Sequence, residues 1–548
     1  MFCNNSLKFF LCLLILNSIS SCTYYFGPNK LTRHFKEPIN TNAAVYDYSA
    51  SQAGGNSFNV HDSIIEFFST MALPEKHEIL DRDYVRILLA KLAQGRDVEQ
   101  INAALINLKP WARHGSTGPF NKKGDYDFTE ITWCSLLYLF GDQPKLLYPA
   151  TRDHVVNVLI ANSGSKTSTV MPGTARLFRE TENHILMGEV SRYLKNQWLH
   201  EHGDTSWVYD NTRNGIEKWM LNHLDEKLRG GFFEFNSNPY SGYSFQALNT
   251  LFSFSHSDTV KHAVNKLLNE VIYEYSLGSI NLARYPPYRR QMWRASNTSF
   301  DWDPVSSIIR VLVNRKTGSN YPVRERQHGL MTLLLRYNLS DDLTRLLLQK
   351  RSSYFAQLGH GRKGSPEIYT GGGNYVLSAG GVHRGKLSQL AAHSTIVLFN
   401  DNIMHADSCF RLCDKGKMKR WNNTGVYANF ACANQPAQIP PQFTPVLEKD
   451  NWKVFYSARS KMSIFTYSDK GVGLLMIKGI PPTRTKKVLD KLIEDNARLN
   501  LKKQFNLPGT GIIGYNLHSP KSKWVITDVN GKKTDRNFDK WPRIHVEQ

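Results

Sequence analysis

The spacing of the apolar residues changes character between residues 351 and 365. Before that stretch they recur at i, i+3, i+4 and i+7, the pattern of a helix with one buried face, as over Val260–Tyr275. After it, short β-branched or aromatic runs such as Thr395–Phe399 are bounded by Gly, Asn, Asp or Lys. One helix, expected over Lys487–Lys503, interrupts them. The pattern therefore predicts a helical domain followed by a strand domain.

The helical part contains roughly a dozen predicted helices with short connections, which favours antiparallel helix pairs. Such pairs build an α-solenoid or a closed α/α toroid, and the lack of a fixed sequence period favours the toroid. Strands in series predict an antiparallel β-sandwich. Besides Val260–Tyr275, helices are expected near 62–72, 81–95, 97–108, 127–141, 151–162, 186–198, 216–228, 242–255, 303–314, 324–337 and 341–350. Besides Thr395–Phe399, strands are expected at Tyr375–Ala379, Val426–Cys432, Trp452–Tyr456, Ser463–Tyr467 and Gly473–Ile477, with a hairpin around Val525–Gly531.

The first 22 residues have the layout of an export signal. Lys8 precedes a short apolar core, Phe9–Leu16, which is too short for a helix to span a membrane core of about 30 Å. The Ile19–Cys22 segment that follows resembles the signal of bacterial lipoproteins. The resemblance implies cleavage before Cys22 and lipidation of that cysteine, with residues 23–60 as a tether and 61–350 and 351–548 as the two domains.

Two acyl chains are enough for stable attachment to a membrane. In lipoproteins of enterobacteria an aspartate after the cysteine retains the protein at the inner membrane, whereas this chain has Thr23. The resemblance therefore implies a location in the cell envelope, at the outer membrane. An ordinary cleaved signal, or a helix with a chance cysteine, is the alternative.

Cysteine use fits an exported chain. An oxidising compartment permits disulfides, and the open alternatives are a bridge between Cys409 and Cys413 or a bridge from either of them to Cys432. Cys134 lies in an apolar stretch and is expected to be a buried thiol. No Cys-x-x-Cys pair or His cluster accompanies these residues, so neither a metal nor another cofactor is expected.

The charge is strongly basic and unevenly spread. The chain has 68 Lys and Arg against 47 Asp and Glu, a net charge of +21, and residues 351–548 alone hold 30 against 14. A balance of this kind favours an anionic partner, although a solvated lysine-rich surface would show the same composition. Export argues against nucleic acid, which leaves an acidic lipid surface or an acidic glycan as the expected anionic partner.

Four polar clusters stand in predicted loops between helices. The densest is Arg179–His184, in which Thr181 is a plausible helix N-cap, although capping needs only one residue. The others are Glu234–Tyr243, Arg284–Arg290 and Asp125–Asp127. Alternate loops of a toroid meet at one end of the barrel. These clusters are therefore predicted to line one cleft.

An exported helical toroid followed by a β-sandwich, with Asn, His, Tyr and Arg in the loops between helices, resembles certain polysaccharide lyases. These cleave chondroitin, hyaluronan, alginate or heparin-like chains, and the likeness is one of architecture over residues 61–540. The segments TENHILMGEVSRYLKNQWL and EFNSNPYSGYSFQALN also resemble a group of bacterial proteins. That second likeness implies no function.

The lyase resemblance implies roles in β-elimination. Asn183 would neutralise the uronate carboxylate and so acidify its α-proton, and His184 or Tyr243 would take that proton. Tyr240 or Tyr243 would protonate the leaving oxygen. Substrate binding would fall to basic and aromatic side chains, namely Arg179, Tyr288, Arg289 and Arg290.

Two other functions fit the same residues. A glycoside hydrolase of the α/α-toroid type would use two facing carboxylates, Glu182 and Glu234. A non-catalytic envelope lipoprotein would bind a glycan or a protein through the same cleft.

Overall fold

The structure is a computed structural model. It describes residues 62–74, 84–112, 124–171, 174, 177–237, 240–284, 303–324, 326–349, 353–360, 366–380, 395–399, 409–412, 424–520 and 523–547. The predicted signal, Cys22 and the tether lie outside these residues. So do Tyr288, Arg289 and Arg290.

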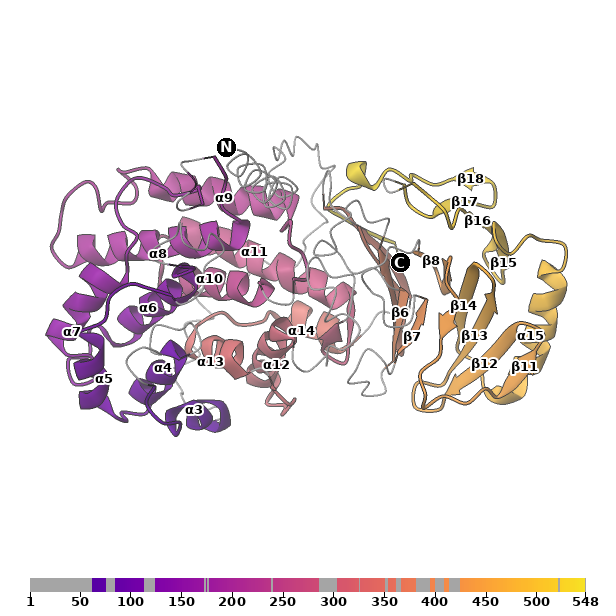
Figure 1. Cartoon of the computed structure of the whole chain (residues 1–548), viewed down its shortest axis with the longest axis horizontal. Coiled ribbons are helices and arrows are strands. Elements are labelled where there is room, and N and C mark those ends of the chain that lie inside the picture. Colours follow the sequence, from indigo (N-terminus) through magenta and orange to yellow (C-terminus); the bar gives the residue numbers. More distant parts are fainter. Residues whose placement is uncertain are drawn as a thin grey trace, which may run out of the picture. The chain divides into compact units, whose positions relative to one another are not determined.

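Helices form most of the regular structure up to residue 348, as the apolar spacing predicted (Figure 1). None of the helices in the described residues is long and apolar enough to cross a membrane. The helices are α3 (Asp62–Ser69), α4 (Val85–Ala93), α5 (Val98–Leu105), α6 (Asp127–Phe140), α7 (Pro149–His154), α8 (Glu182–Glu201), α9 (Ile216–Gly230), α10 (Ser241–Phe254), α11 (Asp258–Leu277), α12 (Pro304–Thr317), α13 (Arg326–Leu334) and α14 (Asp341–Leu348).

Several of these helices begin at side-chain caps. The Asp303 carboxylate accepts from Val305 N at 3.2 Å before α12, and Ser340 Oγ accepts from Leu343 N at 3.2 Å before α14. Each cap satisfies one of the backbone N–H groups that a helix start leaves without a partner. α12 ends at Gly318, whose φ of +70° suits glycine.

Most predicted helices differ from the structure by a few residues at their ends, and two differ more. The helix expected over 151–162 is α7 followed by a π-helical turn, Val155–Leu159. The one expected at Lys487–Lys503 is α15 (Pro482–Asn496). α15 begins earlier because proline suits the first turn of a helix. It ends at Asn496 because that side chain accepts from Asn506 N at 2.7 Å, which holds the following chain in a non-helical loop.

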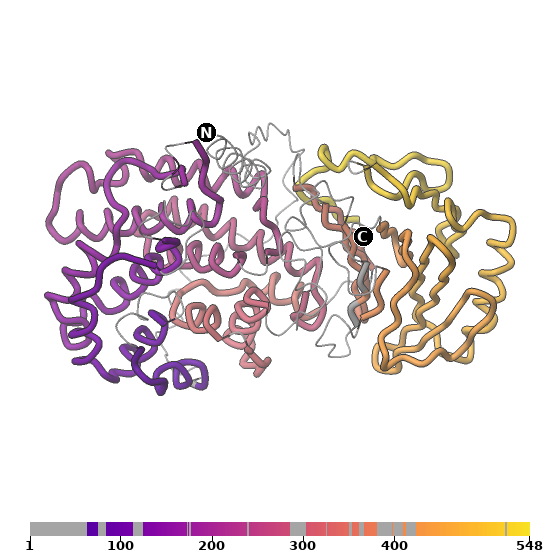
Figure 2. The backbone as a smooth tube through the Cα atoms, in the orientation of Figure 1, coloured from indigo at the N-terminus to yellow at the C-terminus, as the bar shows by residue number. Residues whose placement is uncertain are grey.

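Antiparallel sheets make up most of the remaining regular structure in the described residues, and Figure 2 traces the backbone through them. A two-stranded ribbon pairs β1 (Ser279–Ile280) with β2 (Ala283–Arg284). A seven-stranded sheet has the order β10 (Ala437–Gln438), β7 (Phe410–Leu412), β6 (Thr395–Phe399), β5 (Tyr375–Gly380), β4 (Glu367–Gly371), β3 (Tyr354–Leu358) and β19 (Ile544–Glu547). A six-stranded sheet has the order β11 (Leu447–Lys449), β12 (Trp452–Ser457), β13 (Met462–Asp469), β14 (Val472–Lys478), β9 (Phe430–Ala433) and β8 (Thr424–Tyr427). A four-stranded sheet has the order β15 (Gln504–Leu507), β16 (Gly511–Tyr515), β17 (Ile526–Val529) and β18 (Lys532–Lys533).

The late hairpin is confirmed, because β17 and β18 pair across Asn530 and Gly531, both with positive φ. The single strand expected over Val426–Cys432 is wrong. It is a hairpin of β8 and β9, in which Tyr427 pairs with Phe430 and Ala428 turns the chain at a φ of +48°.

The three larger sheets share one hydrophobic core. It includes Phe355, Leu377 and Phe410 of the seven-stranded sheet, Val426, Ile464 and Leu474 of the six-stranded sheet, Phe505 and Ile513 of the four-stranded sheet, and Leu489 of α15. Burial of these residues together stabilises the strand-rich part of the chain as one body.

The described residues divide into two compact units. The first lies within His61–His223 and Tyr243–His262, and the second within Leu224–Gly242 and Ala263–Gln548. The second unit therefore contains α12 to α14 together with all of the sheets. The change from helix to strand along the chain does not coincide with the division into units.

Candidate active site

The start of α8 departs from simple capping. Thr181 has the extended conformation of an N-cap, with φ −74° and ψ 158°, but its side chain accepts no hydrogen bond from the helix. Its hydroxyl lies 2.8 Å from Asn183 Oδ1 and donates to it. The expected role of Thr181 as a side-chain cap is therefore wrong, and this hydroxyl positions the Asn183 amide instead.

Asn183 carries a buried donor. Its residue is 2% exposed, and its Nδ2 has no hydrogen-bond partner among the described residues. Leaving a buried polar group unsatisfied costs about 1–3 kcal/mol, so native structures rarely do it without a reason. A bound carboxylate or hydroxyl would accept this hydrogen bond.

His184 is held by an acidic residue of a neighbouring helix. Its Nδ1 lies 2.8 Å from Oδ2 of Asp127, the first residue of α6, and the two side chains are 11% and 16% exposed. Burial alone would lower the pKa of His184. The Asp127 carboxylate and its hydrogen bond outweigh burial, with help from Glu180 and Asp125, and raise this pKa to about 9. His184 is therefore an imidazolium cation at neutral pH.

The remaining residues of the cluster differ in exposure. Glu180 accepts a hydrogen bond from Thr181 N at 2.8 Å, and burial raises the pKa of its carboxyl. Glu182 is half-buried in the first turn of α8. Arg179 is exposed and forms an isolated β-bridge with Val170.

The Phe128 ring packs against one residue from each of two predicted clusters, His184 and Tyr243. Phe128 meets the His184 ring edge-on at a centroid distance of 5.0 Å and the Tyr243 ring edge-on at 4.6 Å. The Arg86 guanidinium lies 5.3 Å from the centroid of Tyr243 and donates to Gln246 at 2.9 Å. The Tyr243 ring is therefore packed from two sides and is 5% exposed.

A second polar cluster, in the second unit, was missed by sequence reasoning. Glu367 of β4 accepts from His360 Nε2 at 2.7 Å, from Asn236 Nδ2 at 2.8 Å and from the Tyr369 hydroxyl. The Phe235 ring stacks on His360 at a centroid distance of 3.7 Å. The predicted loop Glu234–Tyr243 is thus tied to a sheet. A glutamate at the start of a strand was the signal that the sequence offered.

The other predicted site residues lie as follows. Glu234 is 5% exposed in the second unit. Tyr240 is half-buried and directly precedes α10. That these residues share one cleft with Asn183 and His184 stays a prediction.

The described cysteines are buried thiols. Cys134 is fully buried, as predicted, and burial raises its pKa. Cys432 is also a buried free thiol, so a bridge from Cys409 or Cys413 to Cys432 is not formed. Within the described ranges, no three His, Cys, Asp or Glu side chains are grouped so that they could hold a metal ion.

No protein-family model matches the chain, and no curated protein matches its sequence. The function is therefore inferred from the geometry of these residues.

Proposed function

We propose that the protein is an exported, lipid-anchored enzyme of the cell envelope that cleaves an acidic polysaccharide by β-elimination. The observation that carries the proposal is the pair at the start of α8, where a buried amide donor without a partner neighbours an imidazolium in sequence. Amide and cation together suit a carboxylate, the group that distinguishes a uronate from a neutral sugar.

The chemistry needs that carboxylate to be neutralised. The proton on C5 of a uronate becomes acidic when hydrogen bonds and positive charge stabilise the developing enolate. In the proposed reaction the C5–H and C4–O bonds break and a C4=C5 double bond forms. The proton leaves on a base, and a proton is delivered to the departing O4.

The roles divide according to charge and exposure. His184, already protonated at neutral pH, suits carboxylate binding better than proton abstraction. Tyr243 is packed between Phe128 and Arg86, so we assign it to positioning. The half-buried Tyr240 is then the proposed proton carrier.

The finer architecture belongs to the same proposal. We take the helices to close as an α/α toroid and the sheets to form a β-sandwich, which the core shared by the three larger sheets supports. The anchor is lipidated Cys22, with the body at the outer membrane. A Cys22→Ser variant that still incorporates a fatty-acid probe would refute the anchor.

The test is product formation from uronate polymers, with alginate, hyaluronan, chondroitin and a heparin-like chain as substrates. β-Elimination leaves a 4,5-unsaturated sugar that absorbs in the ultraviolet, whereas hydrolysis by Glu182 and Glu234 would give reducing ends without that absorption. A non-catalytic binder would give no product. We expect absorbing product with at least one polymer and its loss in Tyr240→Phe, with Tyr243→Phe retaining more activity. Saturated products would overturn the lyase assignment in favour of the hydrolase.

A further inference from the structure

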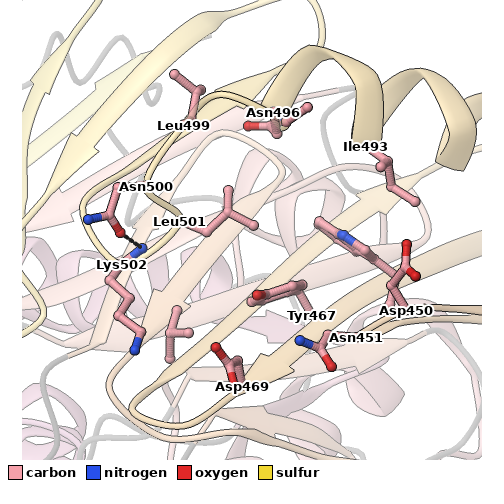
Figure 3. A pocket seen from close by; sticks show the side chains of 13 residues that line it. Asp450, Asn451, Tyr467, Asp469, Ile493, Asn496, Leu499, Asn500, Leu501 and Lys502 are labelled. Carbon is pink, nitrogen blue, oxygen red and sulfur yellow. Dashed lines mark hydrogen bonds between the residues drawn. The ribbon is translucent and has the colours of Figure 1, made fainter.

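The second unit contains an open pocket of about 370 Å³ that takes no part in the proposed elimination. It lies where the β11–β12 turn, the β13–β14 turn and the loop after α15 meet (Figure 3). Its volume is within the range of small-ligand sites, about 300–1,000 Å³.

The inner wall is aromatic and aliphatic. Trp452 and Tyr467 are directly paired across β12 and β13, with ring centroids 5.2 Å apart. Trp452 is buried and Tyr467 is half-buried. Leu501, from the loop after α15, lies beside Tyr467, and Leu499 of the same loop lines the pocket farther from that ring (Figure 3).

Polar groups surround this wall. Asp450, Asn451, Asp469 and Asn500 line the pocket and are exposed. These residues supply carboxylate and amide groups, the partners that hydroxyl groups use in specific binding.

The loop that closes the pocket is fixed by hydrogen bonds. The Asn496 side chain makes two hydrogen bonds with the backbone of Asn506. Its Oδ1 accepts from Asn506 N at 2.7 Å, and its Nδ2 donates to Asn506 O at 3.2 Å. Asn500 Oδ1 accepts from Lys502 N at 3.0 Å. A pocket held in shape before binding loses less entropy when a ligand arrives.

The charge of the residues that line the pocket disfavours an acidic ligand. The lining contains two carboxylates, Asp450 and Asp469, against one cation, Lys502. The domain around it is strongly basic, so the pocket is acidic where its surroundings are not. A uronate would be repelled there.

We propose that this pocket binds one uncharged pyranose residue of a glycan. A pyranose has a face of C–H groups, which packs on an aromatic or aliphatic wall, and a rim of hydroxyls, which bonds to carboxylates and amides. The proposal is independent of the elimination chemistry and stands whether or not the protein is a lyase.

The test is calorimetric titration of the full chain with two neutral probes, cellobiose and N,N′-diacetylchitobiose, and one acidic probe, digalacturonate. We expect at least one neutral probe to bind with a Kd of about 1 mM. Tyr467→Ala should weaken that binding about tenfold. Tyr456→Ala removes a half-buried tyrosine from the same sheet outside the pocket and should leave the Kd unchanged.

An exposed rim residue provides a variant with little risk of unfolding. Asn451→Ala should weaken the neutral probe about threefold or more, the loss of one hydrogen bond. The proposal is overturned if neither neutral probe binds, or if Tyr467→Ala and Tyr456→Ala behave alike. It is equally overturned if Tyr467→Ala weakens digalacturonate as much as the neutral sugars.

Discussion

A histidine bonds a carboxylate in each of the two units, and the two pairs differ in what surrounds them. His184 and Asp127 lie 2.8 Å apart with side chains 11% and 16% exposed, next to an amide donor without a partner. His360 and Glu367 lie 2.7 Å apart with side chains only 1% and 4% exposed, and the carboxylate also accepts from Asn236 and Tyr369. The distances alone do not separate the pairs.

The difference concerns what each pair can still bind. The Glu367 carboxylate uses its acceptor capacity on three donors, and it fixes a loop to a sheet. The pair at α8 lies beside the buried Asn183 amide donor, and the side chains of His184 and Asp127 are themselves slightly exposed. His360 Nδ1 also lacks a hydrogen-bond partner among the described residues, so the two clusters are distinguished by the three donors on the Glu367 carboxylate and by the greater exposure of the His184 and Asp127 side chains. We therefore infer that the Glu367 cluster anchors a loop, and we propose that the pair at α8 binds a ligand.

The largest expected effect is on turnover, at the α8 pair. Asn183→Ala and His184→Ala should each lower kcat/KM about 10³-fold, because each removes a group that stabilises the developing negative charge. Asn183→Ala should change thermal unfolding little, because Nδ2 of Asn183 has no partner among the described residues to lose, whereas His184→Ala also removes the ion pair with Asp127 and should lower the unfolding temperature. His256→Ala, which removes a largely exposed histidine paired with Glu201, is the matched control and should leave the rate unchanged.

Mutation of the Glu367 cluster should change the stability of the protein rather than its turnover. Glu367→Ala leaves the buried His360 Nε2 and the Tyr369 hydroxyl without this acceptor, while Asn236 Nδ2 still has the Tyr369 hydroxyl at 3.1 Å. The unfolding free energy of the second unit should therefore fall by about 3–5 kcal/mol. Urea unfolding followed by circular dichroism measures this. Glu448→Ala, at an exposed pair with Lys453, should stay within about 0.5 kcal/mol of the parent. Equal effects at the two glutamates would remove the distinction between the clusters.

The pH dependence of the rate should depend on Asp127, because this carboxylate raises the pKa of His184. His184 loses its charge as pH rises through about 9, so the alkaline limb of the rate profile should lie there. Because the folded pKa exceeds the ordinary value of 6.5, the pair stabilises the fold fully below pH 6.5 and progressively less up to pH 9. Asp127→Asn should move the alkaline limb down by about one to two pH units. An unchanged limb would show that another group titrates.

The smallest effect is expected from Thr181, whose hydroxyl donates to the Asn183 side chain. Thr181→Val should lower kcat about tenfold with KM nearly unchanged, because the amide loses the hydroxyl that orients it. Thr181→Ser should restore most of the rate. A loss of stability without a change in kcat would instead indicate a purely structural hydroxyl.

The sequence predicted the order of the elements well, because helix and strand spacing depend on residues close in the chain. The predicted bounds of helices and strands were wrong where a single residue decides them, as at Asn496 and in the hairpin turn at Ala428. Nearby residues also identified Asn183 and His184 as candidates. The partner Asp127 was placed in a separate polar cluster, and nothing local indicated the pairing, because the two are 57 positions apart. The Glu367 cluster was missed because it forms from a loop and strands more than 120 positions apart.

The most direct test of the account is the ionisation of His184, measured by NMR on protein labelled at histidine, with His184→Gln to assign the signal. The account predicts a pKa of about 9 in the free protein, a lower value in Asp127→Asn, and a further rise on adding a uronate oligosaccharide. A His184 signal that titrates near 6.5 and does not respond to the uronate would contradict it.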